Sequence, residues 1–132
     1  MDEARKISEA LDAVRSPAYL SASPGIGGRL KSSPEDFLVE EIAEDGSVFA
    51  LDQKMPHPDA QGGRFVNFIL QKRDWSTTSA LSEIGKRLHI AHRYFSVAGN
   101  KDKVAVTAQL ASVSGAPKEA LLSLDIKDIS IN

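Results

Sequence analysis

The sequence predicts an α+β fold, with a mixed, mostly antiparallel sheet and helices packed on one face. Residues 36–43, 65–71 and 104–114 alternate apolar and polar side chains at the period of a β-strand. Residues 77–89 instead repeat apolar side chains at the spacing of an α-helix. The pair Gly99-Asn100, typical of hairpin turns, precedes the last of these strands and favours antiparallel pairing there.

The composition is that of one globular domain. With 132 residues, 42% hydrophobic and 26% charged, the chain is long enough to bury a core. The absence of cysteine excludes disulfides, thiolate metal sites and cysteine nucleophiles. No segment reaches the roughly 20 apolar residues that a membrane helix needs, and the N-terminus has mixed charge in place of an apolar signal core. We therefore expect a soluble, cytoplasmic protein.

The N-terminal region is predicted to be a helix followed by a linker. Apolar residues at helical spacing indicate a helix over residues 3–14, and Pro17 ends it. The Gly-rich residues 23–29 lack the Lys-Ser or Lys-Thr that follows a phosphate-binding loop, so we interpret them as a linker and not as a nucleotide site. The expected division is a helix and linker over residues 1–23 and the folded part over residues 24–132.

Two strands are expected next. Residues 36–43 read as a strand that ends at an Asp-Gly turn, and residues 47–51 are candidates to pair with it. Residues 52–63 have the composition of a surface loop. The strand over residues 65–71 directs alternate apolar side chains to one face, while Asn67 interrupts the other face. Asn67 is therefore expected at an edge or an exposed position.

The second half is predicted to be a helix followed by three strands. Ser76 and the threonines after it are suitable caps for a helix over residues 77–89, which ends in cationic residues that suit the helix dipole. Strands are expected over residues 93–98, 104–114 and 125–131. The chain stops inside an apolar run, which suggests a fragment of a larger protein.

Asp102 is the main candidate for chemistry. The sequence predicts that it lies in a tight turn between two apolar strands, where a carboxylate could act as a nucleophile. The alternative is a plain hairpin turn with charged residues at its tip. The net charge is −2, but residues 71–103 carry seven Lys and Arg against three Asp and Glu, whereas residues 1–61 carry six against twelve. This basic excess around Asp102 favours a nucleic-acid partner, and solvated helix and loop faces remain the alternative.

Other common catalytic sites are disfavoured. The histidines His57, His89 and His92 have no HExxH pattern and no nearby carboxylate, so no metal site is expected. Hydroxyls at residues 76–79 occur where helix caps belong, and no GxSxG elbow is present. The paired acids at residues 35–36 and 40–41 are neighbours on a strand, so each pair points to opposite faces and is unsuited to glycoside hydrolysis.

Two motifs resemble one family. Residues 99–109 resemble the Gly-x-Lys-Asp-x-x-Ala-x-Thr-x-Gln signature of TruD-type pseudouridine synthases, and residues 31–41 resemble the family's Lys-x-x-Pro-Glu-Asp-Phe-x-Val-x-Glu segment. Residues 25–28 are similar to the Gly-rich entry of archaeal-type members, and the strand and helix before the signature also agree in order. The resemblance covers roughly residues 24–113. It implies the N-terminal part of a pseudouridine-synthase-like catalytic domain.

The resemblance implies that Asp102 is the catalytic aspartate that converts uridine to pseudouridine in tRNA, at position 13 in the family's usual target. It implies no metal and no organic cofactor. Phe37 would stack on the target base, Gly99 would take a positive φ and approach the substrate, and Lys101 or another nearby cation would favour the charged form of Asp102. The candidates for phosphate contacts are Lys31, Lys72, Arg73, Lys86, Arg87, Lys101 and Lys103.

The chain departs from the family pattern in extent. The family's downstream Asn-x-Phe-Gly-x-Gln-Arg-Phe-Gly type segment and its inserted second domain have no counterpart here. We therefore expect the chain alone to be weakly active or inactive on RNA. One alternative is a non-catalytic RNA-binding module derived from such an enzyme, and a weaker one is a structural or interaction domain without salt-sensitive RNA binding.

Overall fold

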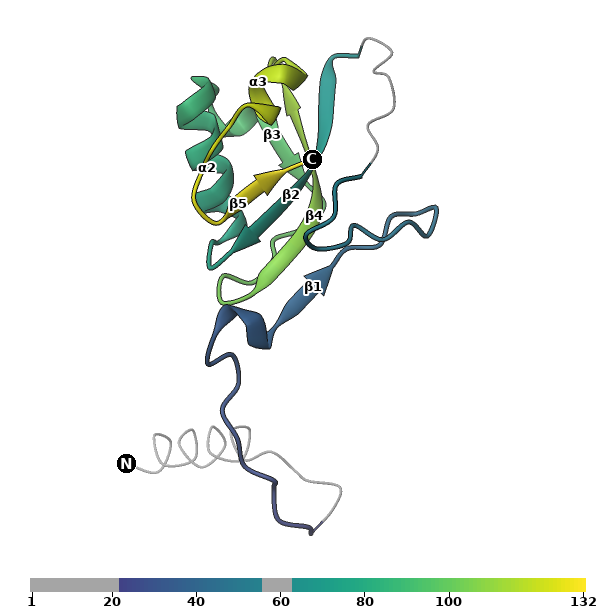
Figure 1. The fold of residues 1–132 in the computed structure, drawn as a ribbon, viewed down its shortest axis with the longest axis vertical. Helices are drawn as coiled ribbons and strands as arrows, with labels where there is room; N and C mark the ends of the chain where they lie inside the picture. Colours follow the sequence, from purple (N-terminus) through teal and green to yellow (C-terminus); the bar gives the residue numbers. More distant parts are fainter. Residues whose placement is uncertain (1–21, 56–62) are drawn as a thin grey trace, which may run out of the picture.

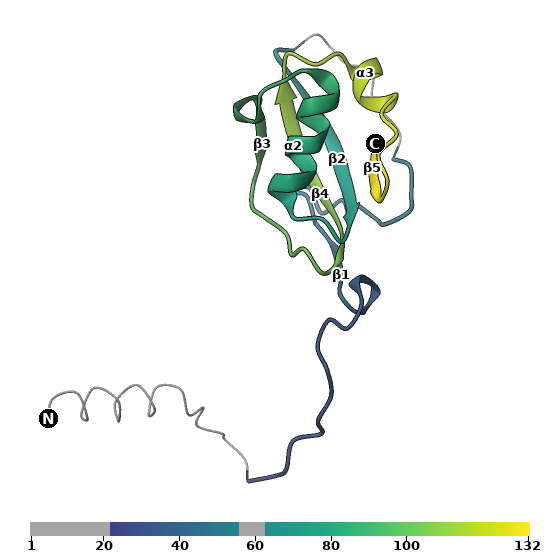
Figure 2. The same ribbon diagram turned by 90° about the vertical axis from the view of Figure 1, so that its left-hand side faces the viewer.

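The computed structural model describes residues 22–55 and 63–132 (Figure 1). The helix predicted over residues 3–14 lies outside the described residues. Residues 22–30 are exposed and extend away from the folded part (Figure 2). In chain order the elements are the 3-10 helix η1 (Pro34–Asp36), β1 (Leu38–Glu40), β2 (Phe65–Arg73), α2 (Thr77–Leu88), the 3-10 helix η2 (His92–Tyr94), β3 (Phe95–Val97), β4 (Val106–Ser114), α3 (Lys118–Leu122) and β5 (Ile129–Ile131).

The sheet is mixed and mostly antiparallel, as the sequence predicted. Its order is β1-β4-β2-β5, and β3 also pairs with β4. β2 runs antiparallel to β4 along its whole length, whereas β1 is parallel to β4. β1 pairs with the beginning of β4 and β3 with its end. Because β1 starts beside the first residues of β4, the segment before β1 lies next to the loop that leads into β4.

The two α-helices of the described residues, α2 and α3, pack against one face of this sheet. Side chains of β2 and β4 form a single buried cluster with side chains of α2 and α3, and Figure 2 shows α2 lying across these two strands. Lys118–Leu122, the helix α3, was not anticipated by the sequence analysis; Leu121 anchors it in the core. Several large apolar side chains stay exposed: Leu38, Ile42, Val48, Phe65 and Leu110.

The helix α2 begins and ends where the sequence predicted. The Ser76 hydroxyl accepts a hydrogen bond from the Ser79 amide at 3.1 Å and so satisfies one of the free amides of the first turn. The helix ends at His89, which takes the left-handed conformation with φ of 57°. The Ile90 amide then donates to the carbonyl of Gly85 at 2.8 Å, the bond that closes a Schellman motif.

Some predicted strand limits are wrong. The strand expected over residues 36–43 is shortened to β1, because the Asp36 carboxylate accepts the Ser33 amide at 2.9 Å and closes η1 first. The expected pairing of residues 47–51 is reduced to one bridge between Ile42 and Val48. Asn67 is exposed as predicted, but β2 lies between β4 and β5 and is not an edge strand.

Candidate active site

Asp102 lies in the connection between β3 and β4. Residues 98–105 form this connection without regular structure, so the tight turn predicted at Gly99-Asn100 is wrong. Gly99 is not among the described glycines with positive φ, and a side chain there would meet no atom of the protein within 4 Å. The positive φ expected for Gly99 is therefore also wrong, because the reversal is spread over eight residues. We call residues 98–105 the Asp102 loop.

The Asp102 carboxylate faces Lys31. Its Oδ1 atom lies 3.1 Å from the Nζ atom of Lys31, and 54% of the Asp102 side chain is exposed against 37% for Lys31. The cation that the sequence analysis expected beside Asp102 is thus Lys31. Lys101 points elsewhere, since its Nζ atom lies 2.9 Å from the Glu41 carboxylate.

Phe37 joins this pair through Lys31. The Lys31 ammonium lies 4.2 Å from the centroid of the Phe37 ring, which is a cation–π geometry. Phe37 is 36% exposed and so offers part of its ring to a ligand. The structure therefore brings together three of the predicted site residues, of which Asp102 is far in sequence from the other two.

The sheet explains why these residues meet. The Val106 amide donates to the carbonyl of Phe37 at 3.1 Å, which continues the parallel pairing of β1 with β4. An ion pair between Glu35 and Arg73 ties η1 to the end of β2. Lys31 itself has φ of 52°, a left-handed conformation that costs a non-glycine residue roughly 1–2 kcal/mol. Such strain is often found at functional positions.

Lys72 supports the Asp102 loop from inside the protein. Its side chain has 0% exposure, and its Nζ atom donates to the backbone carbonyl of Asp102 at 2.8 Å. Burial lowers the pKa of Lys72 from 10.5 to about 8, against the opposing effect of the Asp102 charge. The predicted phosphate contact by Lys72 is wrong, because a buried lysine cannot reach RNA.

Thr77 and Gln109 support the same loop; the sequence analysis interpreted Thr77 only as a helix cap and assigned Gln109 no role. The Lys101 amide donates to Thr77 Oγ1 at 2.9 Å, and Gln109 Nε2 donates to the carbonyl of Gly99 at 2.9 Å. One signal was available for Lys72. It continues the alternation of Val66, Phe68 and Leu70 on the buried face of β2, where a lysine needs a specific partner.

The remaining basic candidates lie at the surface. Lys86 and Arg87 both pair with Glu83 across one turn of α2, and Arg73 pairs with Glu35. Lys103 is exposed in the Asp102 loop. Exposed ion pairs of this kind contribute little to stability, about 0–1 kcal/mol, so phosphate could displace the acidic partner.

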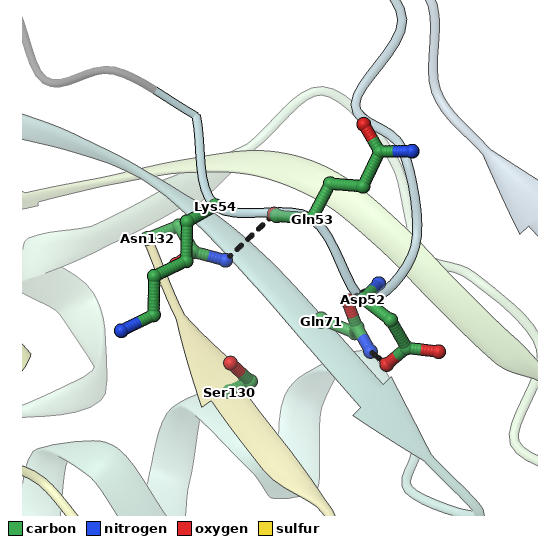
Figure 3. Close-up of a pocket in the computed structure, with 6 residues that line it drawn as sticks. All are labelled: Asp52, Gln53, Lys54, Gln71, Ser130 and Asn132. Atoms are coloured by element: carbon green, nitrogen blue, oxygen red, sulfur yellow. Dashed lines mark hydrogen bonds between the residues drawn. The ribbon is translucent and has the colours of Figure 1, made fainter.

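A separate surface hollow of about 210 Å³ is shown in Figure 3. Asp52 and Gln71 in its wall bond to each other, with Gln71 Nε2 donating to Asp52 Oδ1 at 2.8 Å. Gln71 and Lys72 are neighbours on β2 and point to opposite faces, so the hollow and the Asp102 loop supports occupy opposite faces of the strand. The hollow includes none of the predicted site residues.

Within residues 22–55 and 63–132, no group of three or more His, Cys, Asp or Glu side chains could hold a metal ion. The described helices are also too short or too polar to cross a membrane.

Known proteins resemble this chain in sequence and in fold. The sequence model of one family, tRNA pseudouridine synthase D (TruD), matches residues 13–132. The chain belongs to the TruD family. A TruD relative from Methanococcus vannielii is 41% identical over 115 residues, which make up 86% of this chain and 30% of the relative. A second, from Thermococcus onnurineus, is 41% identical over 117 residues, or 86% of this chain and 24% of that relative.

The crystal structure of a TruD protein from Methanosarcina mazei has the same fold. It superimposes with a TM-score of 0.70 at 25% identity, over 92% of this chain and 25% of that chain. This similarity confirms the predicted α+β class and the resemblance to TruD. The chain spans 24–30% of the length of these TruD relatives.

Proposed function

We propose that residues 24–132 form the N-terminal portion of a TruD catalytic domain that isomerises uridine to pseudouridine in tRNA, with Asp102 as the catalytic residue. One observation carries the proposal: the exposed Asp102 carboxylate lies 3.1 Å from Lys31, whose ammonium lies over the Phe37 ring. A carboxylate, a cation and an open aromatic face are suited to a flipped-out nucleoside. The family match over residues 13–132 supports the same reaction.

The reaction needs no external oxidant or reductant. The bond from ribose C1′ to N1 of uracil breaks, the base turns while held, and a bond from C1′ to C5 forms. N1 gains a proton and C5 loses one, so atoms and electrons balance. Asp102 would serve as nucleophile or base, and Lys31 would hold the Asp102 carboxylate in place.

Substrate binding is assigned to residues beside the carboxylate. Phe37 would stack on the extruded base, since base–aromatic stacking contributes about 1–3 kcal/mol. Lys31, Gly99 and Lys101 would contact the nucleotide or its phosphates, with Lys101 first leaving Glu41. The exposed pair Lys86 and Arg87 would contact phosphate farther along the RNA. A tRNA substrate further supports a cytoplasmic location for the protein.

The test is release of tritium from C5-labelled uridine in a tRNA transcript, catalysed by the full-length protein that contains this chain. We expect Asp102→Asn to lower the rate at least about a hundredfold, the lower range for a group that acts in proton transfer or more directly. Asp125→Asn is the matched control, because it removes the same charge from an exposed residue outside the site.

The outcomes separate the enzyme from the alternatives. Release that is lost in Asp102→Asn and kept in Asp125→Asn supports the synthase. If the full-length protein folds and binds the transcript but releases no tritium, the non-catalytic RNA-binding module is the better interpretation. Absence of salt-sensitive binding as well would favour the structural domain.

A further inference from the structure

Three of the four buried polar side chains among the described residues bond one feature, the Asp102 loop. The four that are buried are Lys72, Thr77, Thr107 and Gln109. They belong to β2, the first turn of α2 and β4, which meet beneath the loop. Burying a polar group costs free energy unless it is hydrogen-bonded. Three of the four meet this requirement by bonding the loop or each other, and Thr107 Oγ1 has no partner among the described residues.

The bonds of Thr77 and Gln109 form a directed chain. The Lys101 amide donates to Thr77 Oγ1, and this hydroxyl donates its proton to Gln109 Oε1 at 3.0 Å. The Nε2 atom of the Gln109 side chain donates to the carbonyl of Gly99. The side-chain oxygen of Gln109 thus accepts a hydrogen bond and its side-chain nitrogen donates one. Together the two bonds fix the orientation of the Gln109 side-chain amide.

Lys72 adds a third attachment, from its Nζ atom to the carbonyl of Asp102. The backbone is thus held at Gly99, Lys101 and Asp102 by buried side chains. Thr77, Gln109 and Lys72 all bind main-chain atoms, so the Asp102 carboxylate stays free to face Lys31. We call Lys72, Thr77 and Gln109 the loop clamp.

We propose that the loop clamp positions the catalytic carboxylate, holding the backbone of residues 99–102 so that Asp102 stays beside Lys31. This inference rests on the proposed function, because it assigns a role in the same reaction to three residues that do not touch the substrate. A displacement of about 1 Å at a reacting group can lower the rate about a hundredfold. Loss of the clamp should therefore lower kcat more than it changes the KM for tRNA.

Thr77 and Thr107 provide a matched pair of variants. Thr77→Val and Thr107→Val each replace a buried hydroxyl by a methyl group of similar size, but only Thr77 bonds the Asp102 loop. In the full-length protein we expect Thr77→Val to lower kcat about ten- to a hundredfold, with little change in KM. Thr107→Val should stay within about twofold of wild type, and Thr77→Ser, which keeps the hydroxyl, should restore most of the rate.

A second measurement does not depend on activity. Hydrogen exchange of the Lys101 amide, followed by NMR in the 132-residue chain, reports the bond to Thr77 directly. We expect the Lys101 amide to exchange at least about tenfold faster in Thr77→Val than in wild type. Its exchange rate should be unchanged in Thr107→Val. If Thr77→Val does not fold, Gln109→Met gives a second test, because it removes the bond to the Gly99 carbonyl and the acceptor of the Thr77 hydroxyl. The kcat should again fall about ten- to a hundredfold with little change in KM.

The results separate this inference from the proposed function. Unchanged exchange and kcat in Thr77→Val, or equal losses in Thr107→Val, would overturn the clamp while Asp102→Asn still tests the enzyme. Absence of turnover in the wild-type full-length protein, with the expected exchange pattern, would overturn the proposed function and support the clamp as a structural unit.

Discussion

Lys72 carries an ammonium group into the protein interior, where none of its surface reaches solvent. Burial disfavours the charged form and lowers its pKa from 10.5 to about 8. Between these two values the unfolded chain binds more protons than the folded chain, so the free energy of unfolding should rise as the pH increases through this window. Below about pH 8 both states are protonated, and the full cost of burying the charge remains.

We therefore expect Lys72 to contribute a rise of up to about 3 kcal/mol in the unfolding free energy between pH 8 and 10.5. Urea denaturation of the chain across this range measures it. Lys72→Met should lack the rise, while Lys127→Met, which removes an exposed lysine, should keep it. A rise of equal size in Lys72→Met would show that other groups cause it.

Sequence reasoning found Asp102, Lys31 and Phe37 because short motifs mark them, and the structure brings the three together. It could not assign partners to charged residues. Lys101 is adjacent to Asp102 in sequence, yet successive side chains point in different directions and Lys101 pairs with Glu41. Lys72 is a basic residue in a charged stretch, so it was interpreted as a surface group. The alternation of buried and exposed positions along β2, continued to Lys72, would have indicated burial.

At the scale of elements, the end of α2 depends on a close approach that only glycine permits. A side chain at Gly85 would place its Cβ atom 2.5 Å from the carbonyl oxygen of Ile90 and 3.3 Å from the Phe95 ring. Both neighbours are fixed, one by the Schellman motif and the other by the core. The helix propensity that alanine would add, about 1 kcal/mol, does not offset such a contact.

We expect Gly85→Ala to destabilise the chain by about 1–3 kcal/mol, as overpacked sites do. His89→Gly, four residues later, should instead stabilise it by about 0.5–1 kcal/mol, because glycine removes the strain of a left-handed residue. Thermal unfolding of both variants measures these effects. Equal stability of Gly85→Ala and wild type would mean that the turn after α2 can shift.

The long elements were predicted more accurately than the short ones. The long strands β2 and β4 and the helix α2 were predicted nearly to their limits, since nine to twelve residues give a clear periodicity. Three-residue strands carry no such signal. β1 was predicted too long because apolar residues continue on both sides of the three that pair, and the five-residue α3 was not predicted.

At the scale of the whole molecule, the candidate site is open. More than half of the Asp102 side chain and over a third of Lys31 are exposed, whereas enzymes exclude water from reacting charges to strengthen their interactions. The chain also spans 24–30% of its TruD relatives. We therefore expect that an active synthase needs residues beyond these 132 to shield the site from water.

We expect the 132-residue chain to convert uridine at least about a hundredfold more slowly than the full-length protein, because the electrostatics of an open site are weakened by solvent. Single-turnover assays at saturating protein separate this from weak RNA binding. Equal rates for the two proteins would show that residues 1–132 already contain the complete site.

The parallel pairing could not be predicted, and it is what places Lys31 beside Asp102. Sequence patterns gave a mixed sheet but not which strands adjoin, because β1 and β4 are separated by β2 and α2 along the chain. Motifs therefore identified the residues of the candidate site. Their proximity depends on the long-range pairing of β1 with β4.

This pairing also affects the order of folding. Leu38 meets Val106 only after about 70 residues are closed into a loop, whereas β3 and β4 meet across about 14. Loop closure on the larger scale costs roughly 1.4 kcal/mol more in entropy, and contacts of high sequence separation form slowly. The hairpin and α2 can thus form early, and the segment that carries Lys31 and Phe37 is expected to join last. A nascent chain would then hold the Asp102 carboxylate in place before that carboxylate acquires its cation.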